Sequence, residues 1–173
     1  AGITGDDGPS HNGMWDLALT GIVPTLHVAA PRDAARLRET LREAVEISHA
    51  PSLLRFPKGA VQSDIPAFER RDGIDVLYRG ESADVLLVSV GAMAAIAVEA
   101  ASRAYREGVG VTVIDPRWVK PLPQSLVTMA QRYKSVVVLE DGIRHGGIAS
   151  SISEMFREAG LNVCLLYTSP SPR

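Results

Sequence analysis

The amino-acid sequence predicts an α/β protein with a mostly parallel sheet, and two alternating patterns indicate this class. Continuous runs of Val, Leu and Ile, such as ADVLLVSVG (83–91) and VGVTVIDP (109–116), are typical of strands buried on both faces. Other segments, such as DAARLRETLREAVEIS (33–48), repeat apolar residues at spacings of three and four, which is typical of helices with one buried face. Strands and helices that alternate in this way form a sheet covered by helices on both faces.

The first 60 residues predict the C-terminal part of one α/β domain. LHVAAP (26–31) is a short apolar strand, and the helix at 33–48 follows it with Asp33 as a suitable N-cap. PSLLRF (51–56) returns as a second strand, which Pro57 and Gly59 end. Because a helix connects the two strands, we expect them to be parallel, with a right-handed crossover.

Residues 61–82 are polar and predict a linker with one short hairpin-like stretch. A second α/β unit at 83–163 follows, in which WVKPLP (118–123) is expected to be a turn and LNV (161–163) the start of a last strand. The other expected strands and helices of this unit are at 83–91, 93–108, 109–116, 125–133, 134–141 and 146–160.

Both ends of the chain predict that it is part of a longer protein. The first residues, AGITGDD, lack an initiating Met and begin in the middle of a pattern. The last ten, CLLYTSPSPR (164–173), match the translation of a common sequencing adapter, so we set them aside in predicting the fold. The only cysteine, Cys164, lies among them, which argues against disulfides and thiolate metal sites in the remainder.

Composition excludes several classes of function. The chain has 46% hydrophobic and 22% charged residues, as a globular protein does. Its formal net charge is −2 with no basic block, so we expect neither nucleic acid nor an anionic membrane as a partner. No apolar run approaches the ~20 residues that span a bilayer.

The loop GDDGPSHNG (5–13) concentrates polar groups that could carry chemistry. Asp7 and His11 are four residues apart on a loop bent by Gly8 and Pro9, so both side chains could point into one cleft. A carboxylate can accept a hydrogen bond from a substrate hydroxyl, and a histidine can exchange a proton near neutral pH. A surface Asx-type turn is the alternative. The spacing does not suggest a metal site.

A second candidate site is RFPKG (55–59), where Arg55 and Lys58 follow a strand. Ligands gather at the carboxyl ends of parallel strands, where a cation can hold a phosphate, although a solvated strand end is the alternative. SVGAM (89–93) is a weak, generic anion site at a helix start.

The three remaining histidines predict structural roles. We expect His27 to be a buried core residue, His49 to lie on the surface, and His145 to lie at the start of a helix.

Several segments together resemble one enzyme family. GDDGPSHNGMWDLALTG (5–21) is similar to a signature of the transketolase-like thiamine-diphosphate enzymes. Four further segments resemble successive blocks of one synthase branch of that family: VAAPRDAARLRETLREA, LRFPKG, VTVIDPRWVKPLP and VVVLEDGIRHGGIASSISE. The resemblance covers residues 1–163. It implies the end of a pyrimidine-binding-type domain at 1–60 and a truncated transketolase-like C-terminal domain at 83–163.

The resemblance also implies an activity. Members of this branch condense pyruvate with D-glyceraldehyde 3-phosphate, with loss of CO2, to 1-deoxy-D-xylulose 5-phosphate, a precursor of isoprenoids and thiamine. They use thiamine diphosphate and Mg2+, and they are cytoplasmic homodimers. By position, Asp7 would bind the hydroxyl of the acceptor, and His11 would contact the same hydroxyl and carbonyl region.

The same resemblance places Lys58 where the family usually has a phosphate-binding Arg, and Arg55 is a second candidate for that phosphate. The groups that bind the cofactor and its metal, and the catalytic Glu, would lie upstream, so we expect this fragment to be inactive alone. Two alternatives stay open: a protein like the E1 β subunit of 2-oxo-acid dehydrogenases, and a non-catalytic α/β binding module.

Overall fold

The computed structural model describes residues 2–3 and 8–168. Its helices are η2 (Pro9–His11), α1 (Asp16–Gly21), α2 (Ala34–Glu46), η3 (Gly91–Met93), α3 (Ala94–Arg106), α4 (Ser125–Ala130) and α5 (Ile148–Glu158). Its strands are β1 (His27–Ala29), β2 (Ser52–Leu54), β3 (Glu69–Arg71), β4 (Ile74–Tyr78), β5 (Val85–Ser89), β6 (Val111–Asp115), β7 (Trp118–Lys120), β8 (Ser135–Leu139) and β9 (Cys164–Thr168).

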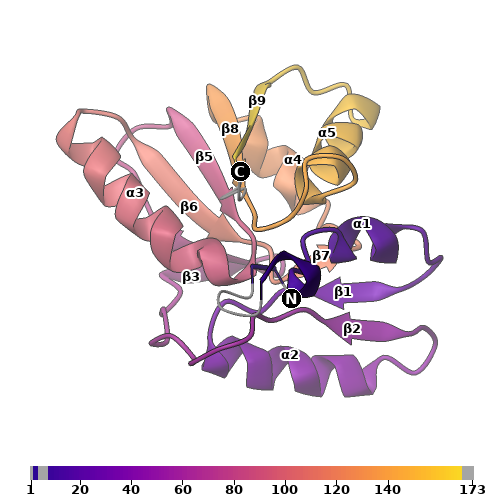
Figure 1. Cartoon of the computed structure of the whole chain (residues 1–173). Coiled ribbons are helices and arrows are strands. Elements are labelled where there is room, and N and C mark those ends of the chain that lie inside the picture. The colour runs from indigo at the N-terminus through magenta and orange to yellow at the C-terminus, as the bar shows by residue number, and fades with distance from the viewer. Residues whose placement is uncertain (1, 4–7, 169–173) are drawn as a thin grey trace.

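The first unit contains a small sheet with the order β2-β1-β7 (Figure 1). β1 and β2 are parallel and are joined through α2, which confirms the predicted strand–helix–strand crossover. The predicted N-cap is also confirmed, because the Asp33 side chain accepts a hydrogen bond from the backbone N–H of Arg36 at 2.8 Å.

The second unit is a six-stranded sheet with the order β3-β4-β6-β5-β8-β9. The four strands β6, β5, β8 and β9 run parallel, and β4 and β3 add an antiparallel edge. Alternate residues of β5 pack against helices on opposite faces of the sheet. Leu87 packs in a cluster with α3, whereas Leu86 and Val88 pack in a cluster with α4 and α5. The prediction of a mostly parallel sheet covered on both faces is therefore confirmed.

The segment expected to be a turn, 118–123, begins instead with a strand. β7 pairs antiparallel with β1 and extends the first sheet, and Val119 on it is buried. The sequence favoured a turn because the segment contains Pro121 and Pro123 and begins soon after Pro116. The strand forms because its partner, Val28–Ala29, lies about ninety residues earlier and offers a free edge.

Two further expectations need revision at the edges of the second sheet. LNV (161–163) is not a strand, and the last strand is β9, which lies inside the tail that we had set aside and pairs with β8 in parallel. The hairpin expected within 61–82 exists as β3 and β4, but β4 is also paired with β6. The chain thus enters the second sheet before residue 83, and the domain boundaries stay a prediction.

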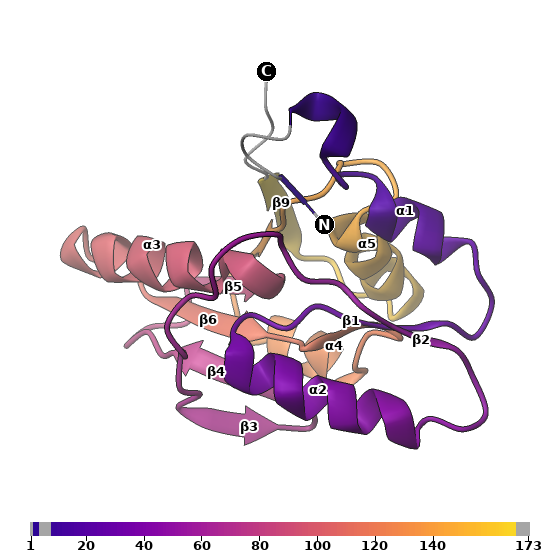
Figure 2. The ribbon, with the colours of Figure 1, turned by 60° about the horizontal axis from the view of Figure 1, so that its bottom comes forward.

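A buried arginine joins the two units. Arg32 follows β1, and its Nη1 lies 2.7 Å from both Asp75 Oδ2 on β4 and Asp115 Oδ2 on β6. Its Nε and Nη2 donate to the backbone carbonyl of Ile65. Beside this contact, Arg70 on β3 pairs with Glu39 on α2, and Figure 2 shows α2 alongside the β3–β4 edge. The orientation of the first sheet on the second therefore depends on buried charge.

We expect Arg32→Ala to destabilise the fold strongly. Removing the guanidinium takes a shared partner from the buried carboxylates of Asp33, Asp75 and Asp115, and breaking such a cluster costs about 3–5 kcal/mol. Arg38→Ala is the matched control, because Arg38 lies on α2 and is exposed. Urea unfolding of both variants measures the difference; equal stabilities would contradict the structural role of Arg32.

The two carboxylates that share Arg32 differ in pKa. Burial raises the pKa of Asp115 to about 6, although Arg32 opposes the shift. Burial acts in the same direction on Asp75, but hydrogen bonds from Arg70 and Arg32 outweigh it and lower the pKa of Asp75. Because folded Asp115 binds its proton more tightly than unfolded Asp115 does, its contribution to stability is complete below pH 4 and is lost as the pH rises through about 6.

We therefore expect the unfolding free energy of the wild type, minus that of Asp115→Asn, to fall by roughly 1–3 kcal/mol between pH 4 and pH 6. Asp84→Asn is the control. Lys134, Ser82 and the Gly110 N–H lower the pKa of Asp84, so its contribution changes only in more acidic solution and its difference stays flat. A flat difference for Asp115 as well would show that its pKa is not raised.

Candidate functional site

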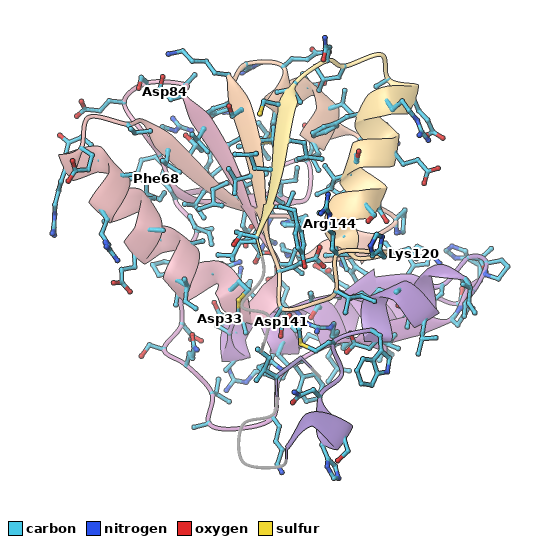
Figure 3. All side chains as sticks on the ribbon, turned by 45° about the horizontal axis from the view of Figure 1, so that its top comes forward. Asp33, Phe68, Asp84, Lys120, Asp141 and Arg144 are labelled. Atoms are coloured by element: carbon cyan, nitrogen blue, oxygen red, sulfur yellow. The ribbon has the colours of Figure 1, made fainter. Side chains whose placement is uncertain are left out.

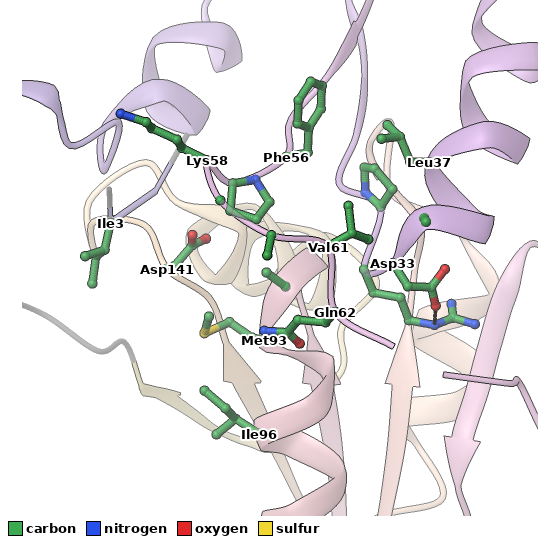
Figure 4. Close-up of a pocket in the computed structure, with 17 residues that line it drawn as sticks. Ile3, Asp33, Leu37, Phe56, Lys58, Val61, Gln62, Met93, Ile96 and Asp141 are labelled. Atoms are coloured by element: carbon green, nitrogen blue, oxygen red, sulfur yellow. Dashed lines mark ion pairs between the residues drawn. The ribbon is translucent and has the colours of Figure 1, made fainter. Parts of the chain in front are cut away.

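A pocket lies where the carboxyl ends of strands from both units meet. It has a volume of about 310 Å³ and is lined by Pro31 and Arg32 after β1, by 56–62 after β2, and by Ala92 and Met93 after β5 (Figure 4). Asp141, which follows β8, completes the wall. This is the position at which ligands bind in α/β sheets.

The lining of the pocket is mainly apolar. Leu37, Phe56, Val61, Met93 and Ile96 all line it. Its polar side chains are Gln62, Asp141 and Lys58, together with Arg32 and Asp33, which pair with each other (Figure 4). A lining of this kind suits a small organic ligand held by few polar contacts.

Lys58 lies at the rim of this pocket. It is exposed, on the turn after β2, and Gly59 beside it has a φ of +124°, which favours glycine. In Figure 4 the ammonium group points away from the pocket. Lys58 is thus placed to meet a charged group that approaches from solvent.

The loop 5–13, which the family resemblance assigns to the acceptor and which we call the acceptor loop, is described only from residue 8 on. Asp7 lies outside the described residues. His11 ends η2 and is exposed, and its Nδ1 lies 3.1 Å from Ser10 Oγ. His11 is not among the residues that line the pocket near Lys58. The structure therefore leaves the predicted roles of Asp7 and His11 as predictions.

The residues at the C-terminal end of the acceptor loop are bonded to the rest of the fold. The Gly13 N–H donates to the Gly2 carbonyl at 2.8 Å, and the Ile143 N–H donates to the Met14 carbonyl at 2.9 Å. A Cβ on Gly146 would lie 2.9 Å from the Cβ of Ala18, so α1 packs closely against the β8–α5 connection. Residues 13–18 are thus held against the second unit.

Arg55 is buried, unlike Lys58. Its Nε lies 2.9 Å from Asp16 Oδ1 in the first turn of α1, and its Nη1 lies 2.6 Å from Asp141 Oδ1. Burial lowers the pKa of Arg55, but Asp141 and Asp16 outweigh it and raise the pKa above its ordinary value. A phosphate at this guanidinium would compete with two carboxylates, so the predicted phosphate contact of Arg55 has less geometric support than that of Lys58.

Sequence reasoning missed Asp16 and Asp141. Asp141 had a usable signal, because it lies just beyond the carboxyl end of the parallel strand in VVVLED. Asp16 had none, since its contact with Arg55 joins positions that are 39 residues apart. Figure 3 shows Asp33 and Asp141 where the two units meet, with Asp84 at the far end of the second sheet.

The other predicted positions have structural surroundings. His27 is half-buried and not fully buried, and its ring meets those of His49 and Trp118 edge to face. His49 and His145 are exposed. The start of α5, which follows His145, is occupied by the buried Glu140 carboxylate, which accepts from the N–H groups of Ile148 and Ala149 at 3.0 Å.

The described residues offer no ready set of metal ligands. Within 2–3 and 8–168, no three or more His, Cys, Asp or Glu side chains lie together as a metal site requires. The described part of the chain also contains no helix that is long and apolar enough to span a bilayer.

Family comparisons match both units. Residues 1–63 match the transketolase pyrimidine-binding domain, and residues 75–167 match the transketolase C-terminal domain. The second match includes most of β9. The fold is also similar to a solved structure described as a split-gene transketolase in an inactive β4 tetramer, with a TM-score of 0.83, 29% identity, and coverage of 94% of this chain and 54% of that one. A transketolase from Campylobacter jejuni has a TM-score of 0.75 at 13% identity, over 96% of this chain and 25% of that one.

Curated relatives are more similar in sequence. The 1-deoxy-D-xylulose-5-phosphate synthase of Mycolicibacterium gilvum is 56% identical over 166 residues, which is 94% of this chain and 26% of that protein. The synthase of the same name from Leifsonia xyli is 51% identical over 95% of this chain and 26% of its own length. The chain spans about a quarter of the length of these relatives. With a family match over more than half of its residues, the chain belongs to the transketolase family.

Proposed function

We propose that this chain is part of a 1-deoxy-D-xylulose-5-phosphate synthase, which condenses pyruvate with D-glyceraldehyde 3-phosphate with loss of CO2. The observation that carries the proposal is the 51–56% identity to synthases of that name across both units. The loop with His11 and the turn with Lys58 are the parts that we assign to the acceptor. Because the chain spans only 26% of those relatives, we propose that it does not complete the reaction alone.

Thiamine diphosphate, held through Mg2+, supplies the carbon–carbon chemistry in the proposed enzyme. The described residues show no fit to its metal, so we assign neither cofactor nor Mg2+ to them and place those contacts elsewhere in the whole protein. The residues of this chain instead bind and orient the acceptor. Asp7 accepts from its hydroxyl, and His11 contacts the hydroxyl and carbonyl region and assists the movement of a proton.

Lys58 binds the phosphate of the acceptor in this proposal. Its exposed ammonium group at the pocket rim supports the assignment. A lysine keeps the charge of an arginine but lacks the planar fork that meets two phosphate oxygens together. We therefore expect Lys58 to attract phosphates with less geometric selection than an arginine would impose.

We also propose that the whole protein is a cytoplasmic homodimer. Three apolar side chains are exposed on α1 and beside it: Trp15, Leu19 and Ile22, with Ile22 79% exposed. Exposed apolar groups so close together are typical of a surface that another protein surface covers.

A non-catalytic binding module is the second candidate, which the mainly apolar pocket favours. Glyceraldehyde 3-phosphate titrated onto residues 1–173 alone separates the two. Binding that Lys58→Met abolishes would favour the module, whereas the synthase proposal expects little or no binding by this chain alone.

In the full-length protein, we expect Lys58→Met to raise the KM for glyceraldehyde 3-phosphate by about 10–100-fold, because a hydrogen bond to a charged group is lost. Lys58→Arg should retain a low KM. Lys134→Met is the control. Lys134 lies just before the start of β8, at the end of the strand away from the pocket, and it pairs with Asp84. An unchanged KM in Lys58→Met would overturn the assignment.

We expect His11→Ala and Asp7→Ala to lower turnover or raise the acceptor KM in the same assay, because each removes a polar contact with the reacting end of the acceptor. The KM for pyruvate should change less. Wild-type kinetics in both variants would remove these two residues from the site.

A further inference from the structure

One guanidinium connects three segments that belong to different parts of the fold. Arg55 lies directly after β2, Asp16 begins α1, and Asp141 lies two positions after the end of β8. Arg55 Nε bonds Asp16 Oδ1 at 2.9 Å, Nη1 bonds Asp141 Oδ1 at 2.6 Å, and Nη2 donates to the Asp141 carbonyl at 3.4 Å. Arg55 is only 6% exposed, so water competes little for these bonds.

Each of these segments leads to a candidate site residue. Arg55 is three positions before Lys58, and Asp16 is five positions after His11. The third residue, Asp141, contacts the backbone just before the acceptor loop. A Cβ built on Gly2 would lie 1.8 Å from Asp141 Oδ2, so the Gly2 backbone packs directly against that carboxylate. Because the Gly13 N–H bonds to the Gly2 carbonyl, the residue that ends the acceptor loop is held beside Gly2 and thus near the partners of Arg55.

The contacts require an arginine. Three different nitrogens of one planar group reach two carboxylates and a carbonyl, and a lysine ammonium on a flexible stem does not reproduce this fork. Asp141 and Asp16 also hold the pKa of Arg55 above its ordinary value, so the group stays charged at any pH at which the protein folds.

We propose that Arg55 is a positioning residue, which holds the acceptor loop and the Lys58 turn in register through Asp16 and Asp141 and does not itself bind the acceptor phosphate. The proposal rests on the proposed function. It assigns a role that differs from the phosphate contact predicted for Arg55 from its sequence position.

The two roles of Arg55 differ in how they depend on the phosphate. A phosphate ligand matters only for a phosphorylated acceptor, whereas a positioning residue matters for any acceptor that the loop must orient. The partner carboxylates give a second distinction. Removing the charge of Asp16 or Asp141 should harm a positioning device, but it should improve phosphate binding by a freed guanidinium.

The test uses the full-length protein with pyruvate and two acceptors, D-glyceraldehyde 3-phosphate and D-glyceraldehyde. We expect Arg55→Met to lower kcat/KM on the order of 100-fold for both acceptors, because a small misplacement of reacting groups costs about that much. Asp141→Asn and Asp16→Asn should lower it for both acceptors too, with less loss than Arg55→Met. Lys58→Met should lower it for the phosphorylated acceptor alone.

Rescue and stability separate positioning from a merely structural role. Arg55→Lys should recover only a small part of the activity, because it restores the charge without the fork. Arg38→Met, at an exposed position on α2, is the control and should behave as the wild type. A loss confined to the phosphorylated acceptor would make Arg55 a phosphate ligand, and a lower Tm with unchanged kcat/KM per folded molecule would make it merely structural. Either result overturns the proposal.

A second measurement on residues 1–173 does not depend on the synthase activity. Amide hydrogen exchange should accelerate in Arg55→Met at Gly13 and Ile143, whose N–H groups bond to Gly2 and Met14, and should not change in Arg38→Met. Unchanged exchange in Arg55→Met would overturn the positioning role. If the wild-type enzyme fails to make product but exchange still depends on Arg55, then the proposed function fails and the positioning role stands.

Discussion

The arrangement of the molecule depends on the buried contact of Arg32 with Asp75 and Asp115. Taking these three charges out of water costs about as much as their attraction returns, so the contact adds little net stability. Its geometry is nevertheless strict, because the same Nη1 lies 2.7 Å from both carboxylates and the other nitrogens reach the Ile65 carbonyl. A small rotation of one sheet on the other would separate Arg32 from Asp75 and Asp115, because Arg32 lies after β1 and both carboxylates lie on the second sheet. The contact thus selects one relative orientation of the two units.

A second arginine extends this control to the site. β1 and β2 are paired in parallel with Ala29 opposite Leu54, so Arg32 and Arg55 leave adjacent strand ends. Arg32 reaches β4 and β6, whereas Arg55 reaches the end of β8. Contacts at two separate places on the second sheet fix an orientation better than one contact does. The pocket between the units is consequently shaped by two buried guanidinium groups that flank its walls.

Local sequence was sufficient to predict the elements whose signals lie within them. The apolar periodicity of α2 lies within its thirteen residues, and its N-cap, Asp33, is the residue directly before them. The strand β7 was missed, because what makes it a strand is the free edge of β1, far away in the sequence. The candidate site divides in the same way. Lys58 could be predicted as a candidate from its position after a strand. The pairing of Arg55 with Asp16 and Asp141 could not, because it joins residues 39 and 86 positions apart.

Those distant partners also make the cluster around Arg55 a poor site for an anionic ligand. One guanidinium with two carboxylates carries a net charge of −1, so the cluster around Arg55 repels a phosphate although it contains an arginine. Lys58 is three residues further along the same chain and exposed, with its ammonium group outside the pocket wall. In the proposed assignment, Lys58 is the cation that attracts a phosphate to this edge of the molecule. In that assignment the buried arginine holds the segments around it in place, and the lysine supplies the charge that the ligand meets.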